Sequence, residues 1–155
     1  MHILGRDRVR ELSEYVCEKW SDPTDPDVPT LRRLQVGDRP LRAALQDSCH
    51  ARNALGATAQ PRDLIARVAQ YVELPSASSC CGAAGTYSMV RPHDAQRVLN
   101  GKLDEIEESG VDVLVTVNPG CQRQVQTGLR RRGSPVRVLH LAELLAESLG
   151  AATDP

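Results

Sequence analysis

Residues 111–121 have the sequence Val-Asp-Val-Leu-Val-Thr-Val-Asn-Pro-Gly-Cys. The first seven residues are mostly apolar and β-branched, which is typical of a strand that is covered on both faces of a sheet. Asn118-Pro119-Gly120 ends this strand abruptly, and Cys121 follows at the point where the next helix is expected to begin. The stretch therefore predicts a buried strand that brings a cysteine to one edge of a parallel sheet.

The segments around this strand alternate between strand and helix patterns. Strands are predicted over 41–45, 71–74 and 136–139, and helices over 92–108, 121–132 and 141–149, with a further helix beginning at Pro61. Strands that alternate with helices of this length pair in parallel through right-handed crossovers. We therefore expect an α/β fold, in which a parallel sheet of about four strands has flanking helices.

The first 30 residues lie outside this alternation. Apolar residues recur at helical spacing within 5–20, at Val9, Leu12, Val16 and Trp20, which predicts a packing helix with one apolar face. Residues 21–30 contain three prolines and several aspartates, a composition typical of a linker. We expect residues 1–155 to form a single domain whose α/β core covers 41–150.

Composition excludes two classes of protein. A formal net charge of -1 lacks the basic surplus of a nucleic-acid-binding protein, so no nucleic acid partner is expected. No apolar run approaches the roughly 18 residues that a membrane span needs, and the N-terminus has no apolar signal core. We therefore expect a cytoplasmic protein.

Four of the five cysteines form three clusters, each placed after a predicted strand. The clusters are Asp47-Ser48-Cys49-His50, Ser79-Cys80-Cys81-Gly82 and Asn118-Pro119-Gly120-Cys121. The carboxyl ends of parallel strands meet at one edge of a sheet, so the clusters are expected to converge. In a reducing cytosol, clustered thiols more often bind metal or do redox chemistry than form structural disulfides. Since thiolates are the soft ligands of iron-sulfur clusters and zinc, the pattern predicts a metallocofactor site.

The residues beside the cysteines suit such a site. Cys121 is expected at the start of a helix, where the positive end of the helix dipole lowers the pKa of a thiol. Gly82, Gly85 and Gly120 lack a β-carbon, so the chain there can bend closely around a bulky group and direct N–H groups to sulfur. His50 is equally consistent with a ligand, a hydrogen-bond donor to the site and an ordinary loop residue.

Other candidate residues are expected to have structural roles. Cys17 lies at the border of the first helix's apolar face, which favours plain packing. His140 is expected to be structural, and His2 and His93 to be exposed. Three consecutive arginines at 130–132 are most simply a solvated last helical turn that complements the helix dipole.

The spacing of the cysteines resembles that of a known family. Cys49, then thirty residues, then Cys80-Cys81-Gly82, then a distant Cys121 is similar to the CCG cysteine-rich domain of heterodisulfide reductases and of the iron-sulfur subunits of glycolate oxidase and lactate-utilisation enzymes. The neighbouring residues, Gln46 to Asn53, Ala83 to Ser88 and Asn118 to Cys121, resemble the glycolate oxidase iron-sulfur subunit. The resemblance covers roughly residues 5 to 150.

This resemblance implies an electron-transfer component that is not catalytic alone. It implies one 4Fe-4S cluster held by Cys49, Cys80, Cys81 and Cys121, with Gly82, Gly120 and His50 around it. The implied partners are flavin-bearing subunits that oxidise glycolate or a related 2-hydroxy acid, and the rest of the iron-sulfur subunit. Proteins of this family usually carry an N-terminal ferredoxin-like domain and a first CCG copy, which these residues lack.

Gln124 is a departure from the resemblance. Relatives of the heterodisulfide reductase type have a second cysteine there, three residues after the last one, so a five-cysteine non-cubane cluster is not expected in this chain. Two other functions remain open. The same four thiolates suit a zinc-stabilised interaction domain, and Cys80-Cys81 suits a metal-free thiol-disulfide protein. The plainest alternative is a pair of packed thiols in a glycine-rich turn.

Overall fold

The computed structural model describes residues 10–22 and 24–150, and it confirms the α/β fold. Its main sheet has four parallel strands in the order β4-β3-β5-β6. The strands are β3 (Arg42–Gln46), β4 (Gln70–Val72), β5 (Val113–Thr116) and β6 (Arg137–His140). The helices are α1 (Leu12–Lys19), the π-helix η1 (Ala51–Leu55), α2 (Ala59–Val68), α3 (Tyr87–Val90), α4 (Pro92–Glu108), α5 (Pro119–Arg132) and α6 (Leu141–Leu149).

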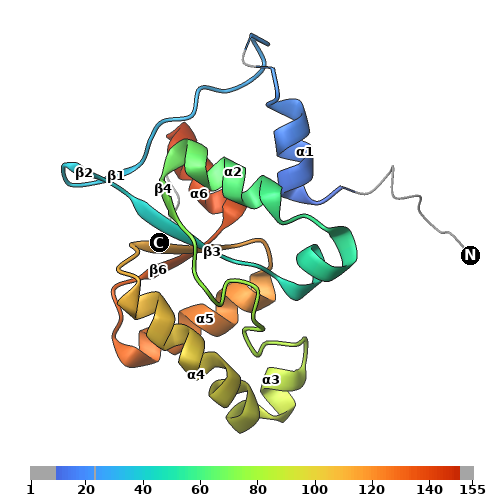
Figure 1. Ribbon diagram of the computed structural model, residues 1–155, viewed down its shortest axis with the longest axis vertical. Helices are drawn as coiled ribbons and strands as arrows, with labels where there is room; N and C mark the ends of the chain where they lie inside the picture. The colour runs from blue at the N-terminus through green and yellow to red at the C-terminus, as the bar shows by residue number, and fades with distance from the viewer. Residues whose placement is uncertain (1–9, 23, 151–155) are drawn as a thin grey trace, which may run out of the picture.

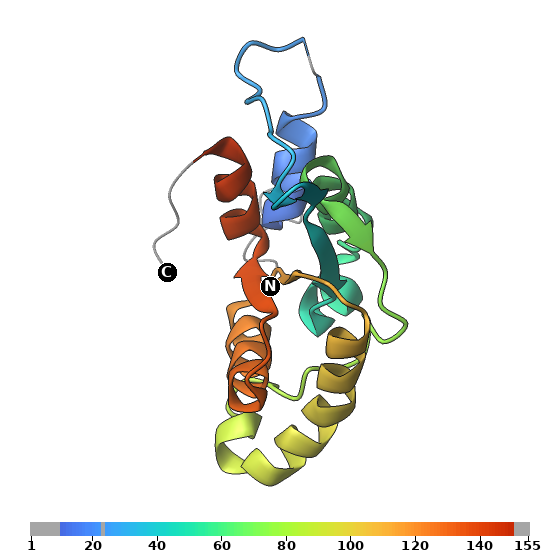
Figure 2. The ribbon, with the colours of Figure 1, turned by 90° about the vertical axis from the view of Figure 1, so that its left-hand side faces the viewer.

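Helices cover both faces of the sheet. Figures 1 and 2 show α1, α2 and α6 on one side of the strands and α3, α4 and α5 on the other. Each side has its own hydrophobic core, because successive residues of a strand point to opposite faces. Ala43 and Leu45 of β3 pack toward α2 and α6, whereas Ala44 packs toward α4 and α5. The sheet is therefore buried on both faces, as the run of valines at 111–117 predicts.

The strand order determines where a binding site can form. From β3 the chain passes through α2 to β4 on one side, and it then returns through α4 to β5 on the other side of β3. The direction of winding thus reverses between β3 and β5. In open α/β sheets, a crevice forms beyond the carboxyl ends of the strands at such a reversal. The first cysteine cluster follows β3 and the third follows β5.

Most predicted elements are observed within two residues of their predicted ends. The helices α4 and α6 have the predicted bounds, and the strand predicted over 111–117 is shortened to β5. The first helix begins at Leu12, because Glu11 caps it by accepting a hydrogen bond from the Ser13 N–H. Leu12 is consequently more than a third exposed, while Val16 is buried. Residues 5–9 of the predicted helix, and His2, lie outside the described residues.

Four short elements were not predicted. A hairpin pairs β1 (Gln35–Val36) with β2 (Arg39–Pro40), which have two residues each, and α3 and η1 have only four and five residues. Elements this short contain too few residues to show a hydrophobic period. The hairpin did have a recognisable pattern, since Gly37-Asp38 is a dipeptide that favours a two-residue hairpin loop.

The helices α4 and α5 approach each other closely. A β-carbon at Gly128 of α5 would lie 2.8 Å from methyl carbons of both Leu99 and Leu103 of α4. At the end of α5, Arg132 forms ion pairs with Asp104 and Glu107 of α4. Arg130 and Arg131 are exposed, as predicted, whereas Arg132 connects two helices.

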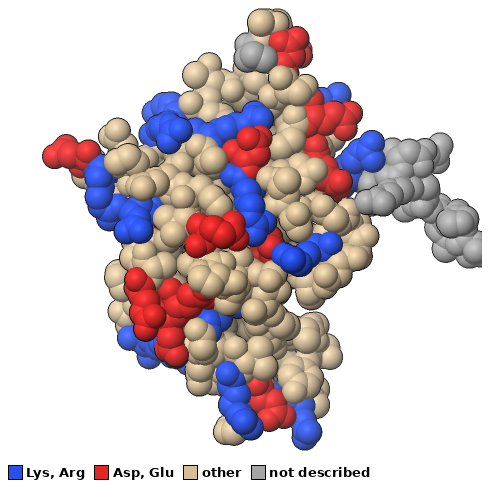
Figure 3. Space-filling view, in the orientation of Figure 1, with Lys and Arg blue, Asp and Glu red and all other residues tan. Residues whose placement is uncertain are grey.

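Positive and negative side chains are interspersed over the face in Figure 3. No helix in the described ranges is long and apolar enough to cross a membrane.

Candidate metal centre

The three cysteine clusters meet at the carboxyl edge of the sheet. A cavity of about 300 Å³ there is lined by all four cysteines that the sequence singled out: Cys49, Cys80, Cys81 and Cys121. His50, Gly85 and Gly120 also line this cavity, which we call the thiol cavity. The convergence agrees with what the parallel sheet predicts, while ligation of a metal by these residues stays a prediction.

Two of the four thiols form a buried pair. The Cys81 and Cys121 side chains are only 3% and 6% exposed, and their sulfur atoms lie 3.1 Å apart in a hydrogen bond. The hydrogen bond between the two thiols lowers the pKa of the Cys81 thiol to about 6, with help from the N–H groups of Cys81 and Ala83. The same hydrogen bond, together with burial, raises the pKa of Cys121 above its usual range.

The prediction that the helix start lowers the pKa of Cys121 was therefore wrong. The helix dipole argument considers one thiol alone. In the structure a second sulfur is in contact with Cys121, and two adjacent negative charges would repel each other. Contact between the two sulfurs therefore lowers the pKa of Cys81 and raises that of Cys121.

The other two thiols, Cys49 and Cys80, are exposed at the rim of the thiol cavity. The Cys80 sulfur accepts a hydrogen bond from the Gly82 N–H at 3.3 Å. That contact is the one expected of a glycine that directs its N–H group to sulfur. The cavity thus has a buried floor of two sulfurs and an exposed rim of two more.

The loop after the paired cysteines has an unusual backbone. Gly82 and Gly85 have φ angles of +82° and +62°, in the left-handed region that favours glycine. A β-carbon at Gly82 would lie 2.6 Å from the Ala95 carbonyl oxygen, so the backbone of α4 leaves no room for a side chain. Ala84 also has a positive φ of 39°, which costs an alanine about 1 kcal/mol. Strain of this kind concentrates at binding sites.

The side chain of Asn118 holds the loop before Cys121 in place. Asn118 caps α5 by accepting a hydrogen bond from the Cys121 N–H at 3.0 Å, and Pro119 occupies the first helical turn. A β-carbon at Gly120 would lie 2.9 Å from this Asn118 oxygen, which explains the glycine. The Asn118 amide nitrogen lies 3.2 Å from Nδ1 of the exposed His50. His50 is therefore positioned at the rim by a partner from another loop.

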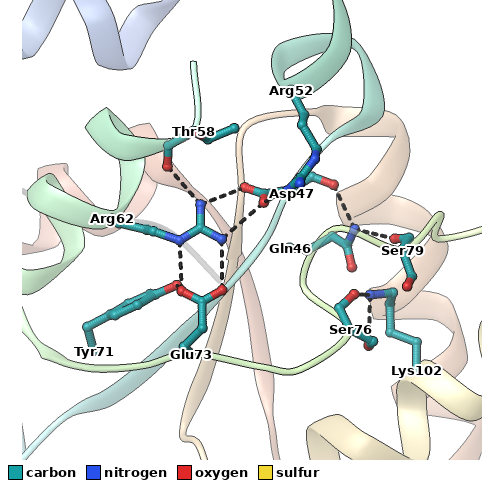
Figure 4. A network of polar contacts seen from close by, with 10 residues as sticks. All are labelled: Gln46, Asp47, Arg52, Thr58, Arg62, Tyr71, Glu73, Ser76, Ser79 and Lys102. Atoms are coloured by element: carbon teal, nitrogen blue, oxygen red, sulfur yellow. Dashed lines mark hydrogen bonds and ion pairs between the residues drawn. The ribbon is translucent and has the colours of Figure 1, made fainter. Parts of the chain in front are cut away.

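A network of charged residues attaches the first cysteine loop to α2 and to the end of β4 (Figure 4). Asp47 is only 5% exposed and accepts hydrogen bonds from Arg62 at 2.9 and 3.0 Å. Arg62 also pairs with Glu73, which lowers the pKa of that carboxyl group, and Arg52 contacts Asp47 at 3.2 Å. The network joins the ends of β3 and β4 to α2, two residues before Cys49.

Asp47→Asn is expected to lower the free energy of unfolding by about 2 kcal/mol. Removing the charge of a buried carboxylate leaves Arg62 with a weaker partner, although Glu73 still pairs with it. Asp63→Asn is the matched control, since Asp63 is exposed and pairs with Arg67 one turn away. Asp63→Asn should lower the free energy of unfolding by at most about 0.5 kcal/mol. Urea denaturation measures both, and equal losses would contradict the expectation.

The loop that leads into Cys80 is attached to the sheet and to α4. The Gln46 amide nitrogen donates to the Ser79 carbonyl oxygen at 3.0 Å, and the Asp47 N–H donates to Ala77. Lys102 of α4 donates to the Ser76 carbonyl oxygen at 2.6 Å. None of these supporting roles was predicted.

One of the supporting residues had a recognisable pattern. Lys102 falls at helical spacing among Leu99, Leu103 and Ile106, on a face of α4 that is otherwise apolar. A charged residue in such a stripe is rarely buried without a partner, so the pattern predicts that Lys102 has a polar partner. The partners of Asp47 had no such pattern, because they are far apart in the sequence.

The remaining candidates have the structural roles that were predicted. Cys17 is half-buried against α2, and its thiol is 3.8 Å from the Gln60 carbonyl oxygen, remote from the thiol cavity. His140 caps α6 by accepting a hydrogen bond from the Ala142 N–H. His93 is exposed.

The donor set of the thiol cavity fits a thiolate-bound inorganic group. Four soft donors from three loops line one cavity, and the glycine-rich backbone beside them leaves room for a bulky occupant. Among residues 10–22 and 24–150, no three His, Cys, Asp or Glu side chains are already gathered around a single ion position.

Comparison with known proteins gives a family match and several relatives. Residues 43–126 match the family described as CCG, cysteine-rich domain. A probable glycolate oxidase iron-sulfur subunit of Bacillus subtilis is 37% identical over 120 residues, which are 75% of this chain and 27% of that protein. A lactate utilization protein A of Exiguobacterium sp. is 32% identical over 155 residues, which are 97% of this chain and 63% of that protein.

A second lactate utilization protein A, from Halalkalibacterium halodurans, is 37% identical over 106 residues, which are 67% of this chain and 43% of the relative. The chain thus spans between 27% and 63% of the length of these three relatives. The matched family region begins in β3 and ends in α5, so it contains all three cysteine loops.

Proposed function

Because this chain belongs to the CCG cysteine-rich domain family, we propose that it is an electron-transfer domain that carries an iron-sulfur cluster. The observation that carries the proposal is the convergence of four cysteines, from the ends of three parallel strands, on one cavity. The names of the relatives support it, since one of them is an iron-sulfur subunit. A cluster held by cysteine thiolates supplies one-electron redox chemistry when it is bound.

The proposed ligands are Cys49, Cys80, Cys81 and Cys121, and the proposed group is a 4Fe-4S cluster. The lowered pKa of Cys81, about 6, favours its thiolate near neutral pH, which is the form that binds metal. Cys49 and Cys80 are exposed, so an incoming group reaches them first. The Gly82 N–H already contacts one ligand sulfur, and contacts of this kind tune the potential of a cluster. His50, Gly82 and Gly120 complete the proposed site.

The biological setting is also a proposal. Names of relatives as a subunit of glycolate oxidase and as lactate utilization proteins support a place in a 2-hydroxy-acid oxidase of the glycolate type. We propose that electrons come from a separate flavin-bearing subunit, and that residues 1–155 act as one CCG-type domain beside further iron-sulfur polypeptide.

The iron, zinc and acid-labile sulfide content of protein purified without oxygen tests the proposal. About four irons and four sulfides per chain are expected, with a visible absorbance band that bleaches on reduction. One zinc and no sulfide would instead establish a structural zinc domain. No metal after reconstitution with iron and sulfide would refute both metal-bound functions.

One observation favours a second candidate function. The sulfur atoms of Cys81 and Cys121, 3.1 Å apart, are close enough for a disulfide to form with small movements. A metal-free thiol-disulfide protein would therefore use Cys81 and Cys121, rather than the adjacent pair Cys80-Cys81. A loss of two free thiols on mild oxidation, in protein that binds no iron, would support this function over the first.

A further inference from the structure

Lys102 is a buried cation on the side of the sheet whose core contains Cys81 and Cys121. Its side chain extends from the apolar face of α4 and the residue is only 4% exposed. The chain has 19 Lys and Arg residues, of which only Lys19 and Lys102 are lysines. Burial of an ammonium group costs several kcal/mol unless hydrogen bonds and an opposite charge compensate it. The partners of Lys102 therefore indicate what it does.

The direct partners of Lys102 are neutral. Its ammonium group donates to the carbonyl oxygen of Ser76 at 2.6 Å and lies 3.3 Å from the hydroxyl oxygen of the same residue (Figure 4). No ion pair joins Lys102 to a carboxylate within the described residues. The nearby Glu105 accepts hydrogen bonds from the Ser76 N–H and hydroxyl groups. Ser76 thus lies between the two charges.

Thiols of the cavity share the surroundings of Lys102. Leu99 and Leu103, the neighbours of Lys102 on α4, belong to the same hydrophobic core as Cys81 and Cys121. Burial lowers the pKa of Lys102, and negative charge on Glu105, Cys81, Cys121 and Cys80 opposes that effect. Lys102 therefore lies on the face of α4 that packs into the core of Cys81 and Cys121, and it contacts the loop that leads to Cys80.

Resting on the proposed function, we propose that Lys102 is a positioning residue that raises the reduction potential of the cluster. It holds Ser76, and so the loop that leads into Cys80, against α4. It also places a fixed positive charge, in a buried setting, beside thiolates that become part of a negatively charged group. Reduction adds one more negative charge, so a nearby ammonium group stabilises the reduced state more than the oxidised state.

Lys102→Gln and Lys102→Met remove this charge, and Lys19→Gln is the matched control. Lys19 is exposed on α1, on the other side of the sheet, and its replacement makes the same change in net charge. We expect all three variants to bind iron and sulfide. In both Lys102 variants the equilibrium constant for reduction should fall about tenfold, which for a one-electron couple is about 59 mV. Redox titration followed by visible absorbance measures the midpoint potential.

The outcomes separate this inference from the proposed function. If wild-type protein binds no cluster, the proposed function fails and the inference fails with it. If the Lys102 variants hold a cluster whose potential matches that of Lys19→Gln, only the inference is overturned, because a purely structural role would leave the potential unchanged. If neither neutral variant holds a cluster, Lys102→Arg decides: recovery of the cluster supports a role for the charge, and continued loss overturns it.

Discussion

Cys81→Ser is expected to remove the iron-sulfur cluster from the protein. About four irons and four sulfides per chain should fall to near none, because a hydroxyl group is a poor substitute for a soft thiolate at a buried position. Cys81 also forms the floor of the thiol cavity together with Cys121, so no solvent molecule can easily take its place. Serine is close to cysteine in volume, which keeps the surrounding packing intact.

Cys17→Ser is the control for this variant. It makes the same chemical change at a half-buried thiol on α1, remote from the cavity, and it should leave the cluster content unchanged. Metal and sulfide analysis of the two variants, both purified without oxygen, measures the difference. Circular dichroism checks that each is folded. A full complement of iron in Cys81→Ser would exclude this residue from the ligand set.

Gly82→Ala is expected to reduce the free energy of unfolding by about 3 kcal/mol. An alanine at φ +82° costs about 1–2 kcal/mol, and its β-carbon would be placed 2.6 Å from the Ala95 carbonyl oxygen. Such overpacking typically costs a further 1–3 kcal/mol, because backbone cannot rotate out of the way as a side chain does. The change therefore forces the cysteine loop away from α4.

Gly85→Ala separates the two causes of this loss. Gly85 also has a positive φ, +62°, but nothing lies within 4 Å of its β-carbon position. Gly85→Ala should therefore lower the free energy of unfolding by only about 1 kcal/mol, which is the penalty for the backbone conformation. Urea denaturation of the cofactor-free proteins gives both values. Equal losses would mean that the contact with Ala95 is unimportant.

The sequence predicted the parallel sheet well because its elements are long or strongly patterned. The helix over 92–108 has a clear apolar period and begins at a proline, and it was predicted with its observed bounds. The hairpin of β1 and β2 has two residues in each strand, too few for any period. The elements that were not predicted are therefore short, and the local sign of the hairpin is its Gly37-Asp38 turn.

The sequence predicted that the four cysteines converge, but it did not predict the contacts that hold their loops in place. The strand ends bring Cys49, Cys80, Cys81 and Cys121 together by a general rule of parallel sheets, so spacing was sufficient. The contacts of Asp47 with Arg62 and of Lys102 with Ser76 depend on how loops from separate segments pack. No local pattern encodes such contacts, and the pKa of Cys121 was mispredicted for the same reason.

The two hydrophobic cores determine how the protein is expected to behave when it is purified without a cluster. They pack against the two faces of the sheet, and most of their residues do not line the thiol cavity. Because burial of these residues stabilises the chain whether or not a metal is present, a preparation exposed to air is expected to be colourless and still folded. The colour of a sample thus depends on the thiol cavity, whereas its fold depends on the two hydrophobic cores. A colourless sample is a candidate for reconstitution rather than a failed purification.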